Sequence, residues 1–234
     1  MEHSPLLNVY RRCDIVMERG EGAYLFDTDG KRYLDFAAGI ATNALGHAHP
    51  LLVQVLSQQA TKLWHCSNAY HTQPLDDFAS ALTQASGFDR VFFCSSGTEA
   101  VEAALKILRR YHYARGDTQR TEFIVAEGAF HGRTMGALSA CLHAKSREGF
   151  EPLLSGFTGV AFNDIEALAA AITPNTAAIF IETIQGEGGV RAHSEAYLQA
   201  ARALADAHGV LLALDEIQCG YGRTGSLFAY EPSG

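Results

Sequence analysis

The chain has 234 residues, 47% of them hydrophobic, and a formal net charge of −8. This is enough for a domain-sized core, and the acidic balance without a basic face argues against a nucleic-acid-binding protein. No apolar run approaches the roughly 20 residues of a membrane span, and Met1 to Pro5 lack the basic flank and apolar stretch of a signal peptide. Five scattered cysteines without a CxxC pair favour reduced thiols. We therefore expect a cytoplasmic protein with neither nucleic acid nor membrane as a partner.

The N-terminal region predicts a β-hairpin followed by two helices. Residues 23–26 and 32–36 are strand-like and flank a turn at residues 27–30. Helices are expected after Pro50 and Pro74, because apolar residues follow each proline at helical spacing and proline suits the first helical turn.

From about residue 90 the chain alternates between strand-like and helix-like segments. The candidate strands are residues 91–94, 123–126, 178–181 and 210–214. The candidate helices are residues 98–114, 164–172 and 194–208. This alternation predicts an α/β fold in which helices cover both faces of a mostly parallel sheet.

Residues 95–100, Ser-Ser-Gly-Thr-Glu-Ala, lie between a strand and a strong helix. The serines can cap the helix, and Gly97 lets the backbone approach a ligand closely. The amides of the first turn and the helix dipole then favour a phosphate group. An ordinary capped helix is the alternative, and the GxxxxGK[ST] spacing of a Walker loop is absent. Ser96, Gly97 and Thr98 are the candidate phosphate-binding residues.

Two glycine-containing loops follow predicted strands. In residues 128–134, Phe130 could stack on a planar ligand and Arg133 could bind a substrate carboxylate, although a core phenylalanine and a surface arginine are equally compatible. Residues 182–189 hold two carboxylates and three glycines, which indicates a ligand-facing loop.

Asp215 follows the buried strand 210–214, at the edge where open α/β sheets bind ligands. A carboxylate there could stabilise a protonated pyridine nitrogen, because an opposite charge raises the pKa of that nitrogen. Gln218 could donate a hydrogen bond to a phenolic oxygen. A helix cap or a salt bridge would also explain Asp215. The pair His47 and His49 has no cysteine at zinc-site spacing, so no metal is expected.

Four motifs occur in a fixed order: residues 96–100, 130–134, 185–189 and 215–218. On these motifs the chain resembles the class III aminotransferases, which are fold-type I pyridoxal-phosphate enzymes, from Gly20 to the end. The resemblance implies a seven-stranded-type, mostly parallel sheet. It also implies that residues 1–48 are a segment of a small domain and that residues 49–234 are an incomplete cofactor-binding large domain.

The resemblance also assigns roles to individual residues. The cofactor pyridoxal 5'-phosphate would be bound by Ser96, Gly97, Thr98, Phe130, His131, Asp215 and Gln218. Phe130 would stack on the pyridine ring, Asp215 would pair with the ring nitrogen and Gln218 would contact the ring oxygen. Arg133 would bind a substrate carboxylate. Glu187 would pair with a later arginine and switch the site between its two substrates.

Enzymes of this family hold the cofactor through a Schiff-base lysine. None of the lysines of the chain fits the expected context: Lys31, Lys62, Lys106 and Lys145. The resemblance therefore implies a lysine roughly ten residues past Gly234, a truncated chain and no catalytic residue within it. Thr183 also departs from the family, which usually has proline there.

Within the family, residues 39–47 are most similar to enzymes that act on acetylornithine, because Ile40 stands where ornithine enzymes usually have tyrosine. This implies transfer of an amino group from N-acetylornithine to 2-oxoglutarate in arginine biosynthesis, giving N-acetylglutamate semialdehyde and glutamate, by a homodimer. Alternative substrates are succinylornithine, succinyldiaminopimelate, 4-aminobutyrate, ornithine and simple amines. A non-catalytic fragment of the same fold is also an alternative.

Overall fold

The computed structural model describes residues 5–234 and divides into two compact units, Met1–Tyr70 and His71–Gly234. Met1 to Ser4, on which the signal-peptide expectation partly rests, lie outside the described residues. Within residues 5–234 no helix combines the length and apolar character needed to cross a membrane. The predicted division at residues 48 and 49 concerns the domains of a whole protein and stays a prediction.

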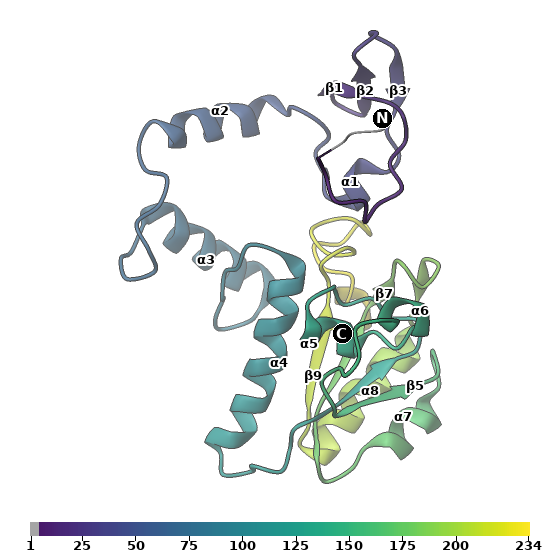
Figure 1. Cartoon of the computed structure of the whole chain (residues 1–234). Coiled ribbons are helices and arrows are strands. Elements are labelled where there is room, and N and C mark those ends of the chain that lie inside the picture. The colour runs from purple at the N-terminus through teal and green to yellow at the C-terminus, as the bar shows by residue number, and fades with distance from the viewer. Residues whose placement is uncertain (1–4) are drawn as a thin grey trace. The chain divides into compact units, whose positions relative to one another are not determined.

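A three-stranded antiparallel sheet forms the start of the first unit (Figure 1). Its strands, in spatial order, are β1 (Met17–Glu21), β2 (Tyr24–Asp27) and β3 (Arg32–Leu34). The predicted hairpin is confirmed as β2 and β3, whereas β1 was not predicted. Asp27 shapes the turn, because its carboxylate accepts the N–H of Lys31 at 2.9 Å and the hydroxyl of Tyr33 at 2.7 Å. These bonds hold the pKa of Asp27 below its usual value.

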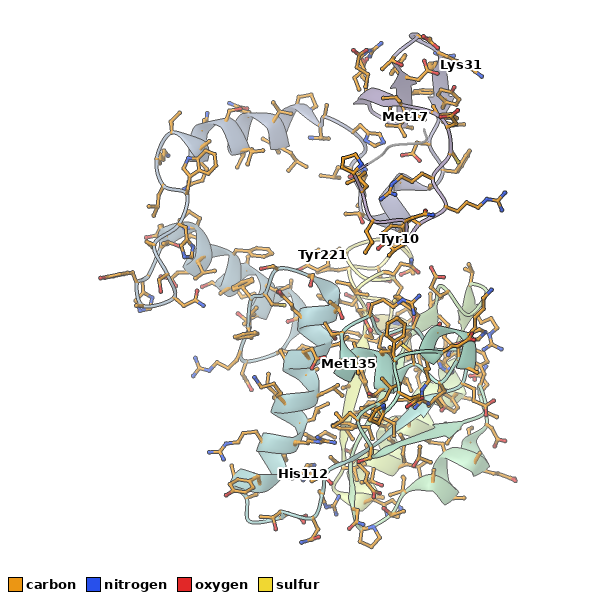
Figure 2. The ribbon with its side chains drawn as sticks, viewed as in Figure 1. Tyr10, Met17, Lys31, His112, Met135 and Tyr221 are labelled. Atoms are coloured by element: carbon orange, nitrogen blue, oxygen red, sulfur yellow. The ribbon has the colours of Figure 1, made fainter. Side chains whose placement is uncertain are left out.

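Helices α1 (Ala38–Ala41) and α2 (Pro50–Ala60) complete the first unit. The predicted helix after Pro50 is confirmed, with proline in its first turn. α2 buries none of its residues, and its apolar side chains extend into solvent (Figure 2). Ile40, on which the substrate expectation rests, has positive φ and is 73% exposed.

A four-stranded parallel sheet is the centre of the second unit. Its strands, in spatial order, are β5 (Phe157–Val160), β4 (Glu122–Ala126), β6 (Thr176–Glu182) and β9 (Leu211–Asp215). The predicted parallel sheet and the three predicted strands that correspond to β4, β6 and β9 are confirmed. The sheet has four strands within residues 5–234, fewer than the seven of the expected type.

The predicted strand at residues 91–94 is wrong, because these residues form neither a strand nor a helix. A strand needs a neighbour to pair with its backbone, and no strand of the described chain pairs with this segment. Phe92 is accordingly 66% exposed. Strand β5 was not predicted, because its sequence Phe-Thr-Gly-Val lacks a strong strand pattern. It forms nevertheless, by pairing with β4.

Helices cover both faces of this sheet (Figure 1). α4 (Gly97–Ala114) and α5 (Met135–Ala140) pack on one face, and α7 (Ile165–Ala171) and α8 (Glu195–His208) pack on the other. The unit also contains α3 (Gln73–Ser86) and α6 (Ala144–Arg147), which bury none of their residues. The four helices predicted in this unit are confirmed as α3, α4, α7 and α8, whereas α5 and α6 were not predicted.

Strand β6 is buried along its whole length and separates two apolar clusters. Ile179 and Ile181 belong to the cluster with Leu168 of α7 and Tyr197 of α8. Phe180 belongs to the other cluster, which includes Val101 and Leu105 of α4 and Ala137 of α5. Alternate residues of one strand therefore bury opposite helical layers, which fixes the register of the strand and the position of its carboxyl end.

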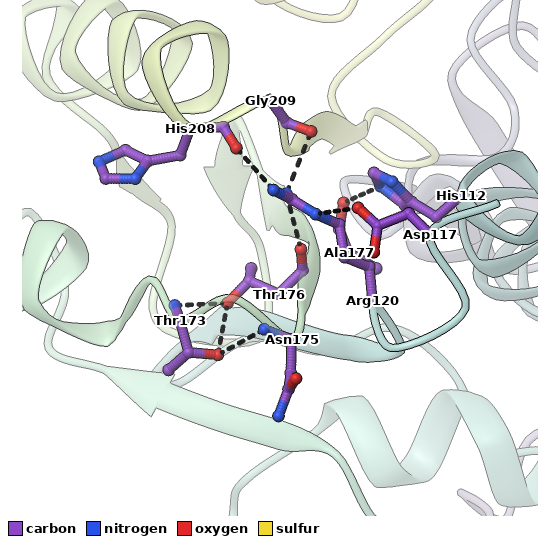
Figure 3. Close-up of polar contacts among 9 residues, drawn as sticks. All are labelled: His112, Asp117, Arg120, Thr173, Asn175, Thr176, Ala177, His208 and Gly209. Atoms are coloured by element: carbon purple, nitrogen blue, oxygen red, sulfur yellow. Dashed lines mark hydrogen bonds and ion pairs between the residues drawn. The ribbon is translucent and has the colours of Figure 1, made fainter. Parts of the chain in front are cut away.

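Arg120 joins three chain segments at the amino end of the sheet (Figure 3). Its guanidinium donates hydrogen bonds to the carbonyl oxygens of Thr176 at 3.3 Å, Gly209 at 3.1 Å and His208 at 3.0 Å. Asp117 lies 2.7 Å from its Nε. One side chain thus links the loop before β4 to the start of β6 and the end of α8.

Replacing Arg120 with alanine is expected to lower the free energy of unfolding of the second unit by about 2–4 kcal/mol. Three carbonyl groups lose charged donors, and each such bond contributes roughly 1.5–3 kcal/mol before solvent takes the vacated place. Urea unfolding followed by circular dichroism measures the loss. Arg110→Ala, at an exposed arginine of α4, is the control and should cost under about 0.5 kcal/mol. A similar small loss for Arg120→Ala would contradict the linking role.

Candidate active site

The carboxyl ends of β4, β6 and β9 meet at one edge of the sheet, and Glu182 at the end of β6 pairs in register with Asp215 at the end of β9. A pocket of about 260 Å³ opens at this edge, between the start of α4 and the end of β9. Its lining includes Gly97 and Val101 from α4 together with Asp215 and Ile217. The structure therefore brings together, in one cavity, a helix N-terminus at Gly97 and a buried carboxylate at Asp215.

The N-terminus of α4 is capped as the sequence predicts. The Oγ atom of Ser96 accepts the N–H of Glu99 at 3.3 Å, and the Glu99 carboxylate accepts the N–H of Ser95 at 2.7 Å. The Oγ1 atom of Thr98 lies 3.1 Å from the hydroxyl of Thr134, which ties the helix start to the loop before α5. The first-turn amides of a helix lack partners within the helix, so this end can accept an anion.

Asp215 is held by a buried histidine. Nδ1 of His131 lies 2.8 Å from Oδ2 of Asp215, with side-chain exposures of 0% and 5%. The imidazole stacks on Phe180 at 4.3 Å between ring centroids, and the second carboxylate oxygen accepts the N–H of Ile217 at 3.1 Å. These contacts fix the orientation of the carboxylate toward the pocket. His131 Nε2 is buried and has no hydrogen-bond partner among the described residues.

Glu182 is a second buried carboxyl group at this edge, 6% exposed. Burial raises its pKa to about 7, even though the N–H of Phe130 donates to its Oε2 at 2.9 Å and so favours the carboxylate. Phe130 itself is 36% exposed. The loop after β4 is therefore attached by its backbone while its aromatic side chain stays accessible.

The remaining predicted site residues have other surroundings. Gln218 is half-buried and lies against Gly186, where an added Cβ would be 1.6 Å from its Oε1. Arg133 is exposed and donates to the carbonyl oxygen of Ser146 at 3.0 Å. Glu187 is exposed in the loop after β7. Of the predicted site residues, Gly97 and Asp215 line the pocket. The others do not line it: Ser96, Thr98, Phe130, His131, Gln218, Arg133 and Glu187.

Strands β7 (Ile184–Gln185) and β8 (Arg191–Ala192) form the hairpin that carries Glu187. Gln185 donates to the carbonyl oxygen of Glu127 at 3.0 Å and accepts from Arg191 at 2.8 Å. Beyond β8, the imidazole of His193 stacks between two aromatic rings, at 4.2 Å and 4.6 Å between centroids. The base of the hairpin is therefore fixed to the sheet.

His193 should make the stability of this region depend on pH. Burial, with a smaller effect of nearby Arg191, lowers its pKa from 6.5 to about 4. The unfolded chain then binds the proton more readily than the folded chain between these values, so stability is present above pH 6.5 and is lost as the pH falls toward 4. The loss is on the order of 3 kcal/mol.

Urea unfolding between about pH 4 and 7 tests this dependence. Because Glu182 titrates in the opposite sense, the informative quantity is the difference between the wild type and His193→Asn. That variant keeps a donor for Asn163, whose oxygen lies 2.9 Å from the imidazole, and should retain more of its stability at low pH. His143→Asn, at an exposed histidine, is the control. Parallel curves for wild type and His193→Asn would refute the prediction.

The residues at this edge fit a phosphorylated aromatic ligand. The start of α4 offers amides to an anion, Phe130 offers a partly exposed ring, and Asp215 offers a fixed carboxylate. The four lysines are all exposed, and none lines the pocket. Among residues 5–234, no group of three histidine, cysteine or acidic side chains is placed to hold a metal ion.

Two residues of this site were not assigned a role from the sequence: Thr134 and Phe180. Glu182 was expected only as one of the two carboxylates of a ligand-facing loop. Thr134 belongs to the same motif as Phe130, so its place near the site could have been expected. The strand ladder that pairs Glu182 with Asp215 could have been inferred from the parallel sheet. The stacking of Phe180 on His131 has no signal in the sequence, because it depends on how the loop after β4 folds back over β6.

The profile of the "Aminotransferase class-III" family matches residues 8–234. An acetylornithine aminotransferase from Agrobacterium fabrum is 51% identical over 231 residues, which cover 99% of this chain and 58% of that protein. An ornithine aminotransferase structure from Toxoplasma gondii aligns with a TM-score of 0.94 at 34% identity, over 98% of this chain and 55% of its own. An N-acetylornithine aminotransferase structure from Stenotrophomonas maltophilia aligns with a TM-score of 0.82 at 40% identity, over 96% and 56%. This chain thus spans little more than half the length of these relatives.

Proposed function

The chain belongs to the class III aminotransferases, which use pyridoxal phosphate, and we propose that the whole protein transfers the amino group of N-acetylornithine to 2-oxoglutarate. The observation that carries the reaction is the pocket in which Asp215, fixed by His131, lies beside the N-terminus of α4. The choice of substrate is supported by curated relatives about 50% identical to this chain, which are named acetylornithine aminotransferases.

The roles proposed for the cofactor-binding residues follow from their chemistry. Ser96, Gly97 and Thr98, at the start of α4, would bind the phosphate group. Phe130 would lie against the ring, and Gln218 would bind the ring oxygen. When bound, pyridoxal phosphate supplies an electron sink for negative charge at the amino-acid carbon.

Asp215 and His131 act together in this proposal. The Asp215 carboxylate would keep a proton on the ring nitrogen, because a nearby opposite charge raises the pKa of that nitrogen. His131 holds Asp215 in one orientation through the 2.8 Å contact, and the ring of Phe180 stacks on the imidazole. The pair therefore supplies a preorganised negative charge in a place where little water can screen it.

The substrate-side roles are proposed for the whole protein. Arg133 would leave its contact with the Ser146 carbonyl to bind a substrate carboxylate, and Glu187 would pair with an arginine outside this chain. A lysine supplied by sequence beyond Gly234 would hold the cofactor covalently and move the proton at the substrate carbon. We further propose that the whole protein is a homodimer in the cytoplasm.

The test measures glutamate formed from 2-oxoglutarate by the full-length protein with N-acetylornithine, ornithine or 4-aminobutyrate as donor. N-acetylornithine should give a kcat/KM at least about tenfold above the others, a discrimination of about 1.4 kcal/mol. Preference for another donor would keep the reaction and replace the substrate. Absence of glutamate with every donor, together with no borohydride-trapped cofactor, would favour the non-catalytic alternative.

A further inference from the structure

We propose that Glu182 is a positioning residue: its carboxyl group holds the two loops that would face the cofactor at a fixed separation. It does so through the backbone amide of Phe130 in one loop and that of Gly186 in the other. The purpose of these loops rests on the proposed function, whereas the linkage itself rests on contacts within the second unit.

The position of Glu182 is unusual for a carboxyl group. It is the last residue of β6, a fully buried strand, and it pairs in register with Asp215 of β9. Two carboxyl groups therefore lie side by side at the edge of a low-dielectric core. No salt bridge joins Glu182 to a lysine or arginine within residues 5–234, and burial of such a group without a cationic partner is costly.

Backbone amides occupy this carboxyl group instead of a cation. The N–H of Phe130 donates to Oε2 at 2.9 Å, and the backbone amide of Gly186 also lowers the pKa of the side chain and so favours its charged form. The two amides belong to segments that follow different strands of the sheet. A shared acceptor sets the distance between them in a way that neither strand could set alone.

Each segment carries, or lies against, a residue with a proposed role toward the cofactor. Phe130 would lie against the ring, and the next residue, His131, holds Asp215. Gly186 has Gln218 directly against it, since an added Cβ would be 1.6 Å from the Oε1 atom of that side chain. A shift of either segment would therefore move a residue that contacts the ring or its oxygen.

Removing the hydrogen-bond acceptor shows whether Glu182 positions the loops or only fills space in the core. Glu182→Ala deletes it, whereas Glu182→Gln keeps a carbonyl oxygen that can accept from both amides. Hydrogen exchange of this chain, resolved to single amides, should show Phe130 and Gly186 exchanging at least about tenfold faster in Glu182→Ala. In Glu182→Gln they should stay within about threefold of wild type. The amides of β4 report whether the unit stays folded, and Glu127→Ala, at an exposed carboxylate of the same loop, is the control.

The cofactor readout is the induced circular dichroism of pyridoxal phosphate added to the full-length protein. Glu182→Ala should weaken or shift this band and Glu182→Gln should restore it. Unchanged exchange of both amides in Glu182→Ala, or equal acceleration in both variants, would overturn the positioning role. An unchanged band in Glu182→Ala would also overturn it. If wild type gives no band while exchange responds as expected, the linkage of the loops stands and the proposed function fails.

Discussion

Replacing Asp215 with alanine is expected to lower kcat/KM for the proposed amino-group transfer by the full-length protein by about 10³-fold, because it would remove the charge proposed to lie beside the ring nitrogen. The same change should lower the free energy of unfolding by about 1–3 kcal/mol. His131 would keep its buried position on Phe180 but lose the partner of Nδ1, and the N–H of Ile217 would lose its acceptor.

Asp215→Asn separates these two effects. The amide oxygen has the same shape and can still accept from His131, so the unfolding free energy should fall by less than about 1 kcal/mol. It carries no charge, and the loss of activity should therefore remain near that of the alanine variant. Steady-state kinetics and urea unfolding on the same preparations measure both quantities. An asparagine variant with near wild-type activity would show that the charge of Asp215 is not used.

Local signals in the sequence identified much of this fold. Ser194 caps α8 through a 3.2 Å bond to the N–H of Tyr197, and Asp164 caps α7 through a 2.9 Å bond to that of Ala167. Caps and apolar periodicity act within one turn, so they can be recognised without knowing the tertiary structure. Strand β6 was equally recognisable, because a fully buried strand is apolar at every position between its ends.

Long-range contacts account for the rest. His131 and Asp215 are 84 residues apart, and their pairing depends on the order of the strands rather than on either local sequence. Arg133 was predicted to bind a substrate carboxylate from its motif, yet its nearest partner here is the Ser146 carbonyl oxygen, in a helix that the sequence did not reveal. The raised pKa of Glu182 likewise depends on burial that only the assembled sheet creates. A sequence motif can therefore identify candidate site residues, but it does not identify the residues that they contact in the folded chain.

Gly132→Ala is expected to be a strongly destabilising single-methyl change at this edge of the sheet. Gly132 has φ of +129°, and an added Cβ would lie 2.3 Å from Oγ1 of Thr98 and 3.1 Å from Cβ of Ala137. The backbone strain costs about 1–3 kcal/mol and the overlap a further 1–3 kcal/mol, so the free energy of unfolding should fall by roughly 2–6 kcal/mol. Thr98 would be pushed from the start of α4, and the phosphate binding proposed there should weaken.

Two comparisons separate strain from overlap. Gly149 also has positive φ, +81°, but an added Cβ there would meet nothing within 4 Å, so Gly149→Ala should show the backbone cost alone. Thr98→Ala removes the atom nearest to the new methyl group, Oγ1, and leaves Cβ of Thr98 at 2.8 Å. In a double-mutant cycle it should therefore recover part of the loss caused by Gly132→Ala, about 1 kcal/mol. Additive losses in urea unfolding would mean that α4 and the loop before α5 are not in the close contact seen here. The recovery is expected because Thr98 is held close to residue 132. Its hydrogen bonds to Thr134 stabilise the start of the helix, and they also keep its side chain where a Cβ at residue 132 would lie.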